Sequence, residues 1–211
     1  HQQAKRKLIE HIQNVQGVSL DIDVPILSFA RRMTSYKRAD LLFSNIEKLK
    51  QIARDKPFQI ILGGKAHPQD VEGKHLIQRL HVLSHELKQE IKVVFLENYD
   101  IAQAKLLVSG SDIWLNTPLR PHEASGTSGM KAAINGVVNL SVLDGWWIEG
   151  CVEGQTGWAI GGESPTENGD DAQSLYQKLE QEVLPMYYQQ KDELIHMMKA
   201  SIQKNGSYFN S

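Results

Sequence analysis

Apolar and polar positions divide the chain into alternating blocks that predict strands and helices in turn. Six short runs are apolar nearly throughout, which is typical of buried strands. They are residues 23–30, 58–64, 91–96, 111–116, 137–143 and 157–161. Between them, large apolar residues recur every three or four positions, the spacing of one helix face. The helical patterns run from Leu42 to Ile52, from Ile77 to Leu87 and from Ile101 to Leu107, followed by two C-terminal helices separated at Pro185.

Strands that are apolar on both sides and alternate with helices favour an α/β fold. We expect a doubly wound parallel sheet covered by helices on both faces. The chain of 211 residues is ample for one core and short for two, so residues 1–211 are predicted to form a single domain. Residues 162–171 (GESPTENGDD) read as a solvated surface loop.

Ligands of such sheets bind beyond the carboxyl ends of the strands. Four polar loops follow the first four predicted strands and should therefore meet at one edge. They are RRMTSYKR, GGKAHP, ENY and NTPLRPHEASG. We expect the binding site at this edge.

Composition narrows the classes of partner. A net charge of −2 and a pI near 6.5 argue against a nucleic-acid or anionic-membrane partner. The longest uncharged stretch, residues 132–143, is too short and polar to span a bilayer. A single cysteine, Cys151, fits a reducing cytoplasm. His1 is not a natural start residue, so we expect a piece of a longer chain.

A cluster of four cations follows the first predicted strand. Arg31, Arg32, Lys37 and Arg38 lie within eight residues, a density that would attract a phosphate or a phosphorylated ligand. The alternative is a solvated basic face. Arg38 in particular could begin the next helix and face solvent. The position of the cluster at the predicted ligand edge favours the phosphate site.

Small residues mark a helix start after the fourth strand. Ser125, Gly126, Thr127, Ser128 and Gly129 would let backbone N–H groups approach an anion at a helix N-terminus.

If that helix begins near Gly126, Thr127 and Lys131 are four positions apart and share one face. An anion at the first turn next to a lysine matches the layout of pyridoxal phosphate, whereas the alternative is a lysine that reaches solvent from a packed helix. Glu123 could cap the helix or accept hydrogen bonds from sugar hydroxyls, and the spacing leaves both open.

The run from Glu123 to Gly150, EASGTSGMKAAINGVVNLSVLDGWWIEG, resembles the signature of the glycogen/α-glucan (maltodextrin) phosphorylases, and LDGWWIEG resembles their shorter bacterial branch. Four further segments resemble the family in the same order, so the resemblance covers nearly the whole chain. They are SFARRMTSYKRADLLF, ILGGKAHPQDVEGK, VVFLENYDIAQAKLL and SLYQKLEQEVLPMYY.

The resemblance implies the Rossmann-like C-terminal half of a GT-B fold, with the N-terminal GT-B domain absent from this chain. It implies reversible phosphorolysis of terminal α-1,4-linked glucose by inorganic phosphate, giving glucose 1-phosphate with retention. By matching positions, Lys131 would carry pyridoxal 5'-phosphate as a Schiff base. The other implied cofactor contacts are Arg31, Tyr99, Thr127 and Ser128; Arg32 and Lys37 would bind substrate phosphate, and Glu123, Ser125 and Gly126 would hold glucose.

Two departures from the longer phosphorylases are visible: Arg31 stands where they have lysine, and Ser128-Gly129 where they have glycine-asparagine. Both changes keep a cation and backbone donors. Without the other half of its cleft, the fragment is expected to fold but not to catalyse. Two alternatives remain, a nucleotide-sugar-dependent glycogen synthase-like transferase and a non-catalytic sugar-phosphate binding domain.

Overall fold

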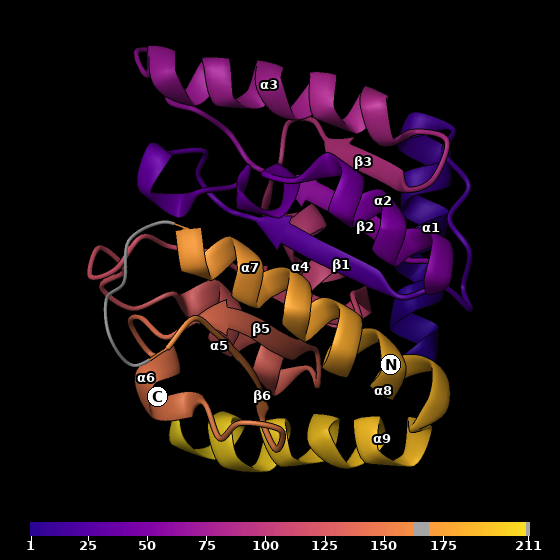
Figure 1. Ribbon diagram of the computed structural model, residues 1–211, viewed down its shortest axis with the longest axis vertical. Helices are drawn as coiled ribbons and strands as arrows, with labels where there is room; N and C mark the ends of the chain where they lie inside the picture. Colours follow the sequence, from indigo (N-terminus) through magenta and orange to yellow (C-terminus); the bar gives the residue numbers. More distant parts are fainter. Residues whose placement is uncertain (163–168, 210–211) are drawn as a thin grey trace.

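The computed structural model describes residues 1–162 and 169–209, with a six-stranded sheet at its centre (Figure 1). Neighbouring strands are parallel and follow the order β3-β2-β1-β4-β5-β6. The strands are β1 Ile26–Ala30, β2 Gln59–Gly63, β3 Lys92–Leu96, β4 Ile113–Asn116, β5 Val138–Val142 and β6 Gly157–Ile160. All six predicted strands are confirmed. Each strand lies within its apolar run and is shorter than it. The reason is that only residues paired with a neighbouring strand belong to the hydrogen-bonded ladder.

Helices join the strands and close the chain. They are α1 Gln2–Gln16, α2 Ile46–Asp55, α3 Val71–Leu87, α4 Ile101–Gly110, α5 Thr127–Ile134, α6 Trp147–Gly150, α7 Gly169–Lys178, α8 Leu184–Gln189 and α9 Lys191–Ala200. Short 3-10 turns (η1 Ser35–Lys37, η2 Leu41–Phe43) and π-helical segments (η3 Leu179–Val183, η4 Ser201–Gly206) complete the set. Helices α1 and α6 have no counterpart in the predicted elements.

The helix expected from Leu42 to Ile52 is two elements. The turn η2 comes first, and α2 begins after Asn45, whose side chain accepts a hydrogen bond from the N–H of Lys48. This capping bond satisfies a free donor of the first turn, so a new helix starts there.

The break expected at Pro185 is wrong. Helix α7, segment η3 and helix α8 follow one another without interruption through Pro185, and the chain turns only at Gln190, between α8 and α9. Proline lacks the N–H that an α-helix would need. Here it stands at the start of α8, directly after the wider π-helical turns of η3.

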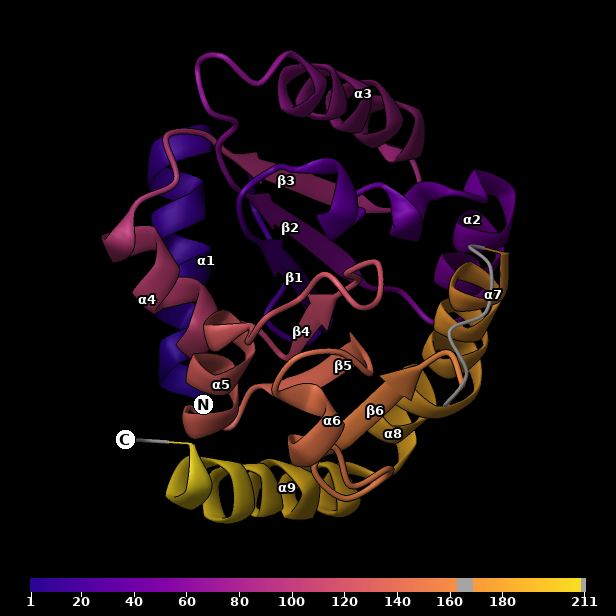
Figure 2. The ribbon, with the colours of Figure 1, turned by 90° about the vertical axis from the view of Figure 1, so that its left-hand side faces the viewer.

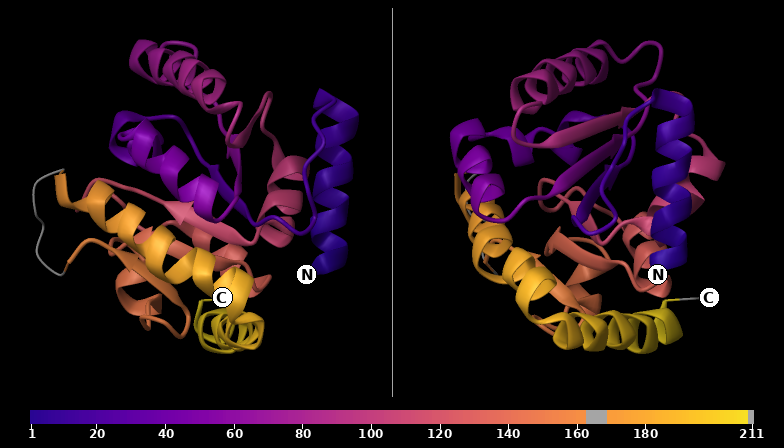
Figure 3. Two further views of the ribbon diagram at one scale, coloured as in Figure 1. Left: turned by 45° about the vertical axis from the view of Figure 1, so that its right-hand side comes forward. Right: turned by 90° about the vertical axis from the view of Figure 1, so that its right-hand side faces the viewer.

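Helices cover both faces of the sheet, as expected for a doubly wound fold (Figure 2). One core joins the sheet to α2, α3 and the C-terminal helices, with Phe29, Leu62 and Leu80 among its members. A second core joins the other face to α1 and α4 and includes Leu8 and Trp114. Figure 3 shows α1 and α4 side by side on that face. The alternation of large apolar side chains to both faces explains why the strands read as continuous apolar runs.

A buried ion pair fixes α1 to the amino end of β4. Lys5 is fully buried, and its Nζ lies 2.8 Å from Oδ2 of Asp112. The same Nζ donates to the carbonyl of Val24 (2.9 Å) and to the hydroxyl of Tyr187 (3.1 Å). Burial raises the pKa of Asp112, and the charge of Lys5 opposes that shift. The pair therefore depends on both partners.

The segment predicted as a solvated loop, residues 162–171, is only partly within the described residues. Residues 163–168 lie outside them. Gly169 to Asp171 belong to α7, and Asp171 is buried, which contradicts the expectation for that position. Within the described ranges, no helix has both the length and the apolar character needed to cross a bilayer.

Candidate functional site

The loops that follow β1 to β4 meet at one edge of the sheet, as predicted. The N–H of Arg31, after β1, donates to the carbonyl of Gly63 at the end of β2 (3.0 Å). The N–H of Leu119, after β4, donates to the carbonyl of Tyr36 (2.7 Å). Tyr99, after β3, packs so closely on β2 that a methyl group at Gly63 would lie 3.0 Å from its ring. Strands adjacent in the sheet thus bring together loops distant in sequence.

Two of the predicted cations converge on one carboxylate oxygen. Arg31 Nη2 and Lys37 Nζ each lie 2.6 Å from Oε2 of Glu123, and we call these three residues the Glu123 triad. All three side chains are nearly buried, at 8%, 7% and 10% exposure. In such a dry setting, two cations around one anion leave an excess of positive charge. The triad can therefore attract a further anion.

Glu123 does not cap the helix that follows it. The N-cap of α5 is Gly126, and no side chain caps it. Instead, the N–H of Glu123 donates to Oδ2 of Asp144 (2.9 Å), two residues after the end of β5. Sequence reasoning missed Asp144, although an acidic residue immediately after an apolar strand is the signal that could have found it. Asp144 holds the backbone that presents the Glu123 carboxylate.

The expectation that Arg38 could begin a helix and face solvent is wrong. Arg38 closes η1 in the left-handed region (φ 46°), and its guanidinium reaches Asp171 Oδ2 at 2.5 Å. Its Nε and Nη2 also donate to the carbonyls of Thr117 and Pro118, both at 2.9 Å. The prediction failed because the partner of Arg38 is the carboxylate of Asp171, which lies 133 residues away in sequence. Arg32, by contrast, is exposed.

The predicted helix start at Gly126 is confirmed. Gly126 has φ 92°, which favours glycine, and α5 begins at Thr127. Ser128 Oγ and Arg31 Nη1 are buried and have no hydrogen-bond partner among residues 1–162 and 169–209. Buried polar atoms normally have hydrogen-bond partners, so these two atoms are available to bind a ligand. Both atoms belong to residues that line the same hollow.

That hollow has a volume of about 400 Å³ and is open to solvent. It brings together most of the predicted site residues, all from the loops after β1 and β4 and the first turn of α5. Those in its lining are Arg31, Arg32, Lys37, Glu123, Ser125, Gly126, Thr127 and Ser128. Tyr99 and Lys131 are outside its lining.

Lys131 lies one turn beyond Thr127 in α5, and both residues are exposed. The spacing predicted that the two residues share one face of the helix, and the role of Lys131 stays a prediction. Its carbonyl accepts a hydrogen bond from Asn135 Nδ2 (2.8 Å). Tyr99 is half-buried beside β2, and burial, followed by the charge of Asp100, raises the pKa of its phenol to about 12. Tyr99 therefore remains a neutral hydrogen-bond donor near pH 7.

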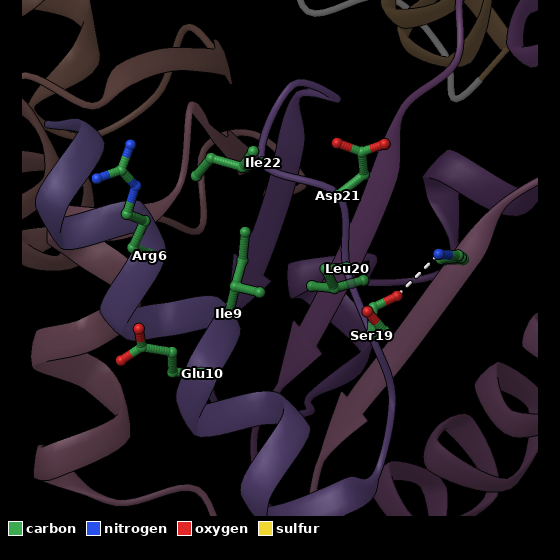
Figure 4. A pocket seen from close by; sticks show the side chains of 8 residues that line it. Arg6, Ile9, Glu10, Ser19, Leu20, Asp21 and Ile22 are labelled. Atoms are coloured by element: carbon green, nitrogen blue, oxygen red, sulfur yellow. Dashed lines mark hydrogen bonds between the residues drawn. The ribbon is translucent and has the colours of Figure 1, made fainter.

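A different hollow, of about 450 Å³, lies at the opposite end of the strands (Figure 4). It is formed by α1 and by the loop that leads to β1. Arg6 and Glu10 line it from α1 and Asp21 from the loop, so its charges are mixed. It contains none of the predicted site residues. The hollow at the Glu123 triad is thus the better candidate site.

Gly145 supports the segment that carries Glu123, and replacing it with alanine tests this role. Gly145 has φ 58°, and an added methyl group would lie 2.4 Å from the carbonyl oxygen of Ser125. We expect Gly145→Ala to lower the free energy of unfolding by roughly 2–4 kcal/mol, combining the backbone conformation with the clash. Urea denaturation measures this.

The matched control for that variant is Gly154→Ala. Gly154 has a similar φ of 70°, but no atom of the residues that the structure describes lies within 4 Å of the methyl group it would gain. It should lose only the conformational part, roughly 1 kcal/mol. Equal losses in the two variants would show that the contact between Gly145 and Ser125 has no energetic role.

Comparisons with known proteins show the family to which this chain is similar. Residues 1–210 match the family described as carbohydrate phosphorylase. The chain is 45% identical to the maltodextrin phosphorylase of Thermococcus litoralis, an alignment that covers 100% of this chain and 28% of that protein. It is 44% identical to the glycogen phosphorylase of Aquifex aeolicus, covering 96% of this chain and 33% of that protein. The chain therefore spans about a third or less of the length of these relatives, and by sequence and fold it belongs to the carbohydrate phosphorylase family.

Proposed function

We propose that this chain is the C-terminal, cofactor-carrying GT-B domain of an α-glucan phosphorylase. In the parent protein, it would face an N-terminal GT-B domain and act with it in reversible phosphorolysis of terminal α-1,4-linked glucose to glucose 1-phosphate. The observation that carries the proposal is the Glu123 triad, in which Arg31 and Lys37 meet Glu123 beside the first turn of α5. Cations suit phosphate, and a carboxylate suits sugar hydroxyls.

The residues present fit pyridoxal phosphate. Ser128 Oγ and Arg31 Nη1, which have no hydrogen-bond partner within the described part of the chain, offer polar contacts to an anion at the first turn of α5. The helix start adds free N–H groups and the positive end of its dipole. In the proposal, Lys131 attaches the cofactor, while Arg31, Tyr99, Thr127 and Ser128 hold it. When bound, the cofactor supplies a phosphate group that can exchange a proton with inorganic phosphate.

The chain's own residues would then position the substrates. Arg32, exposed at the hollow, and Lys37, buried in the triad, would bind inorganic phosphate and stabilise it beside the positively charged sugar carbon. The Glu123 carboxylate, fixed by Asp144, would accept hydrogen bonds from glucose hydroxyls. Ser125 and Gly126 line the same hollow and would complete the glucose contacts.

The main rival is a nucleotide-sugar-dependent glycogen synthase-like transferase, which shares a basic loop but needs no lysine at position 131. A non-catalytic sugar-phosphate binding domain is the second rival. The names of the relatives, maltodextrin and glycogen phosphorylase, favour phosphorolysis over both. They leave the cofactor and the individual residue roles to experiment.

The decisive experiment assays the parent protein for shortening of maltodextrin in the presence and absence of inorganic phosphate. We expect glucose 1-phosphate to form only with phosphate. The 211-residue chain assayed alone is the control and should give no turnover, since half of the proposed cleft is missing. Glucosyl transfer from a nucleotide sugar without phosphorolysis would favour the synthase-like rival. A parent protein that binds the cofactor but turns over neither substrate would favour the binding domain.

A further inference from the structure

Arg38 ties the cation loop after β1 to the loop after β4. Its Nε and Nη2 donate to the carbonyls of Thr117 and Pro118, each at 2.9 Å. Thr117 returns the contact, because its hydroxyl shares its one hydrogen between the carbonyls of Lys37 and Arg38, both at 3.0 Å. The backbone that carries Lys37 is therefore bonded to the second loop from both sides.

Asp171 holds this junction together from a third element. It is 4% exposed and lies in the first turn of α7, which follows β6. One oxygen, Oδ2, is 2.5 Å from Arg38 Nη2, and the other, Oδ1, is 3.5 Å from Arg120 Nη2. Arg120 also donates to the carbonyl of Gly162 (2.6 Å). One buried carboxylate thus pairs with two arginines, one from each loop.

The position of Lys37 depends on this arrangement. Its Nζ lies 2.6 Å from Glu123 and 4.5 Å from the centre of the Tyr36 ring. The adjacent residue, Arg38, is in the left-handed region, a conformation that a non-glycine residue keeps only when its surroundings hold it. The bonds of the Arg38 guanidinium contribute to holding it, together with the backbone bonds from Arg38 N–H to the Ser35 carbonyl (3.0 Å) and from Leu41 N–H to the Arg38 carbonyl (2.9 Å). A change in Arg38 would therefore move the Lys37 ammonium relative to Glu123.

We propose that Arg38 and Asp171 are a positioning pair for the reaction. They do not touch substrate; they fix Lys37, and through it the Glu123 triad, in the geometry that binds inorganic phosphate. This inference rests on the proposed function. The guanidinium suits the role because its planar fork reaches two carbonyls and a carboxylate at once, which a lysine ammonium on a flexible stem does not reproduce.

The test compares Asp171→Asn with wild type in the parent protein. Asparagine keeps the shape and an acceptor but removes the charge. We expect KM for inorganic phosphate to rise about tenfold or more, with the amount of bound pyridoxal phosphate unchanged, because misplacing a binding group by about 1 Å can cost up to 10²-fold. Arg38→Lys keeps the charge and loses the fork, so it should show the same rise. It also carries the test if Asp171→Asn fails to fold.

The matched control is Glu180→Gln, which removes another ion pair of the same helical run. Glu180, in η3, pairs with Lys48 of α2 at 2.8 Å, away from the junction with Arg38. This variant should leave KM for phosphate unchanged. A purely structural role for Asp171 would lower thermal stability and leave KM for phosphate at the wild-type value, and that result would overturn the inference. If wild type itself shows no phosphorolysis, the proposed function has failed, and the inference falls with it.

Discussion

Replacing Lys131 with alanine should abolish phosphorolysis by the parent protein while leaving the domain folded. In the proposed function, this amine attaches the cofactor, so its loss removes the cofactor's phosphate from the site. We expect turnover to fall at least about a thousandfold, at or beyond the upper end of the 10²–10³-fold loss for one transition-state hydrogen bond. Lys131 is exposed and alanine favours helices, so the free energy of unfolding should change by no more than about 0.5 kcal/mol.

Two measurements check this prediction. The first is the rate of glucose 1-phosphate formation from maltodextrin. The second is trapping of pyridoxal phosphate on the protein with borohydride, which should label wild type and not the variant. Lys105→Ala is the control, since Lys105 is an exposed helical lysine in α4. Unchanged turnover in Lys131→Ala would refute the assigned role, and would leave the solvated-lysine alternative in its place.

Replacing Lys5 with methionine should give the largest loss of stability. The substitution leaves Asp112 buried without its lysine partner, with the ring of His1 still 2.9 Å from Oδ1, and breaking a buried ion pair from one side costs about 3–5 kcal/mol. The double variant Lys5→Met, Asp112→Asn removes both charges and should recover much of that loss. Urea denaturation of the two single variants and the double variant measures the coupling between the residues.

The loss caused by Lys5→Met should also depend on pH. Burial already raises the pKa of Asp112 above its ordinary value of 3.8. The charge of Lys5 opposes this rise, and Lys5→Met removes that opposition. A carboxyl group with a raised folded-state pKa favours folding in its protonated form, and this contribution is lost as pH rises through that pKa. The destabilisation should therefore be smaller near pH 4 than at pH 7.

The control for this pair is Arg54→Met. Arg54 is mostly exposed and pairs with Glu90 at 2.8 Å, so its removal should cost at most about 1 kcal/mol at either pH. A Lys5→Met variant no less stable than Arg54→Met would contradict the view that α1 depends on its buried charge.

Local patterns predicted the strands and the start of α5 because their causes are local. Continuous apolar runs reflect burial on both faces, and Gly126 supplies the backbone freedom that the turn before Thr127 requires. The parallel sheet follows from the alternation of strands and helices. The edge at which the loops meet then follows from the sheet, before any side chain is placed.

Pairings between distant residues could not be predicted in the same way. Arg38 looked solvated because its partner, Asp171, is 133 positions away, in a segment whose composition resembled a loop. Glu123 left two options open, and only the fold shows that Arg31 and Lys37 lie beside it. Helix α1 has a sequence rich in charge, and the burial of Lys5 inside the core depends on Asp112, more than a hundred residues later.

The adjacency of β1 and β4 has a consequence for the growing polypeptide. Lys37 and Glu123 are 86 positions apart, so their contact closes a long loop, and its entropic cost must be met by the rest of the sheet. A ribosome-bound chain that has exposed only the cation loop carries its positive charge without the carboxylate that balances it. The phosphate affinity of the folded site should therefore appear late in synthesis, in a single step. It requires that β4 and the segment after it have left the exit tunnel.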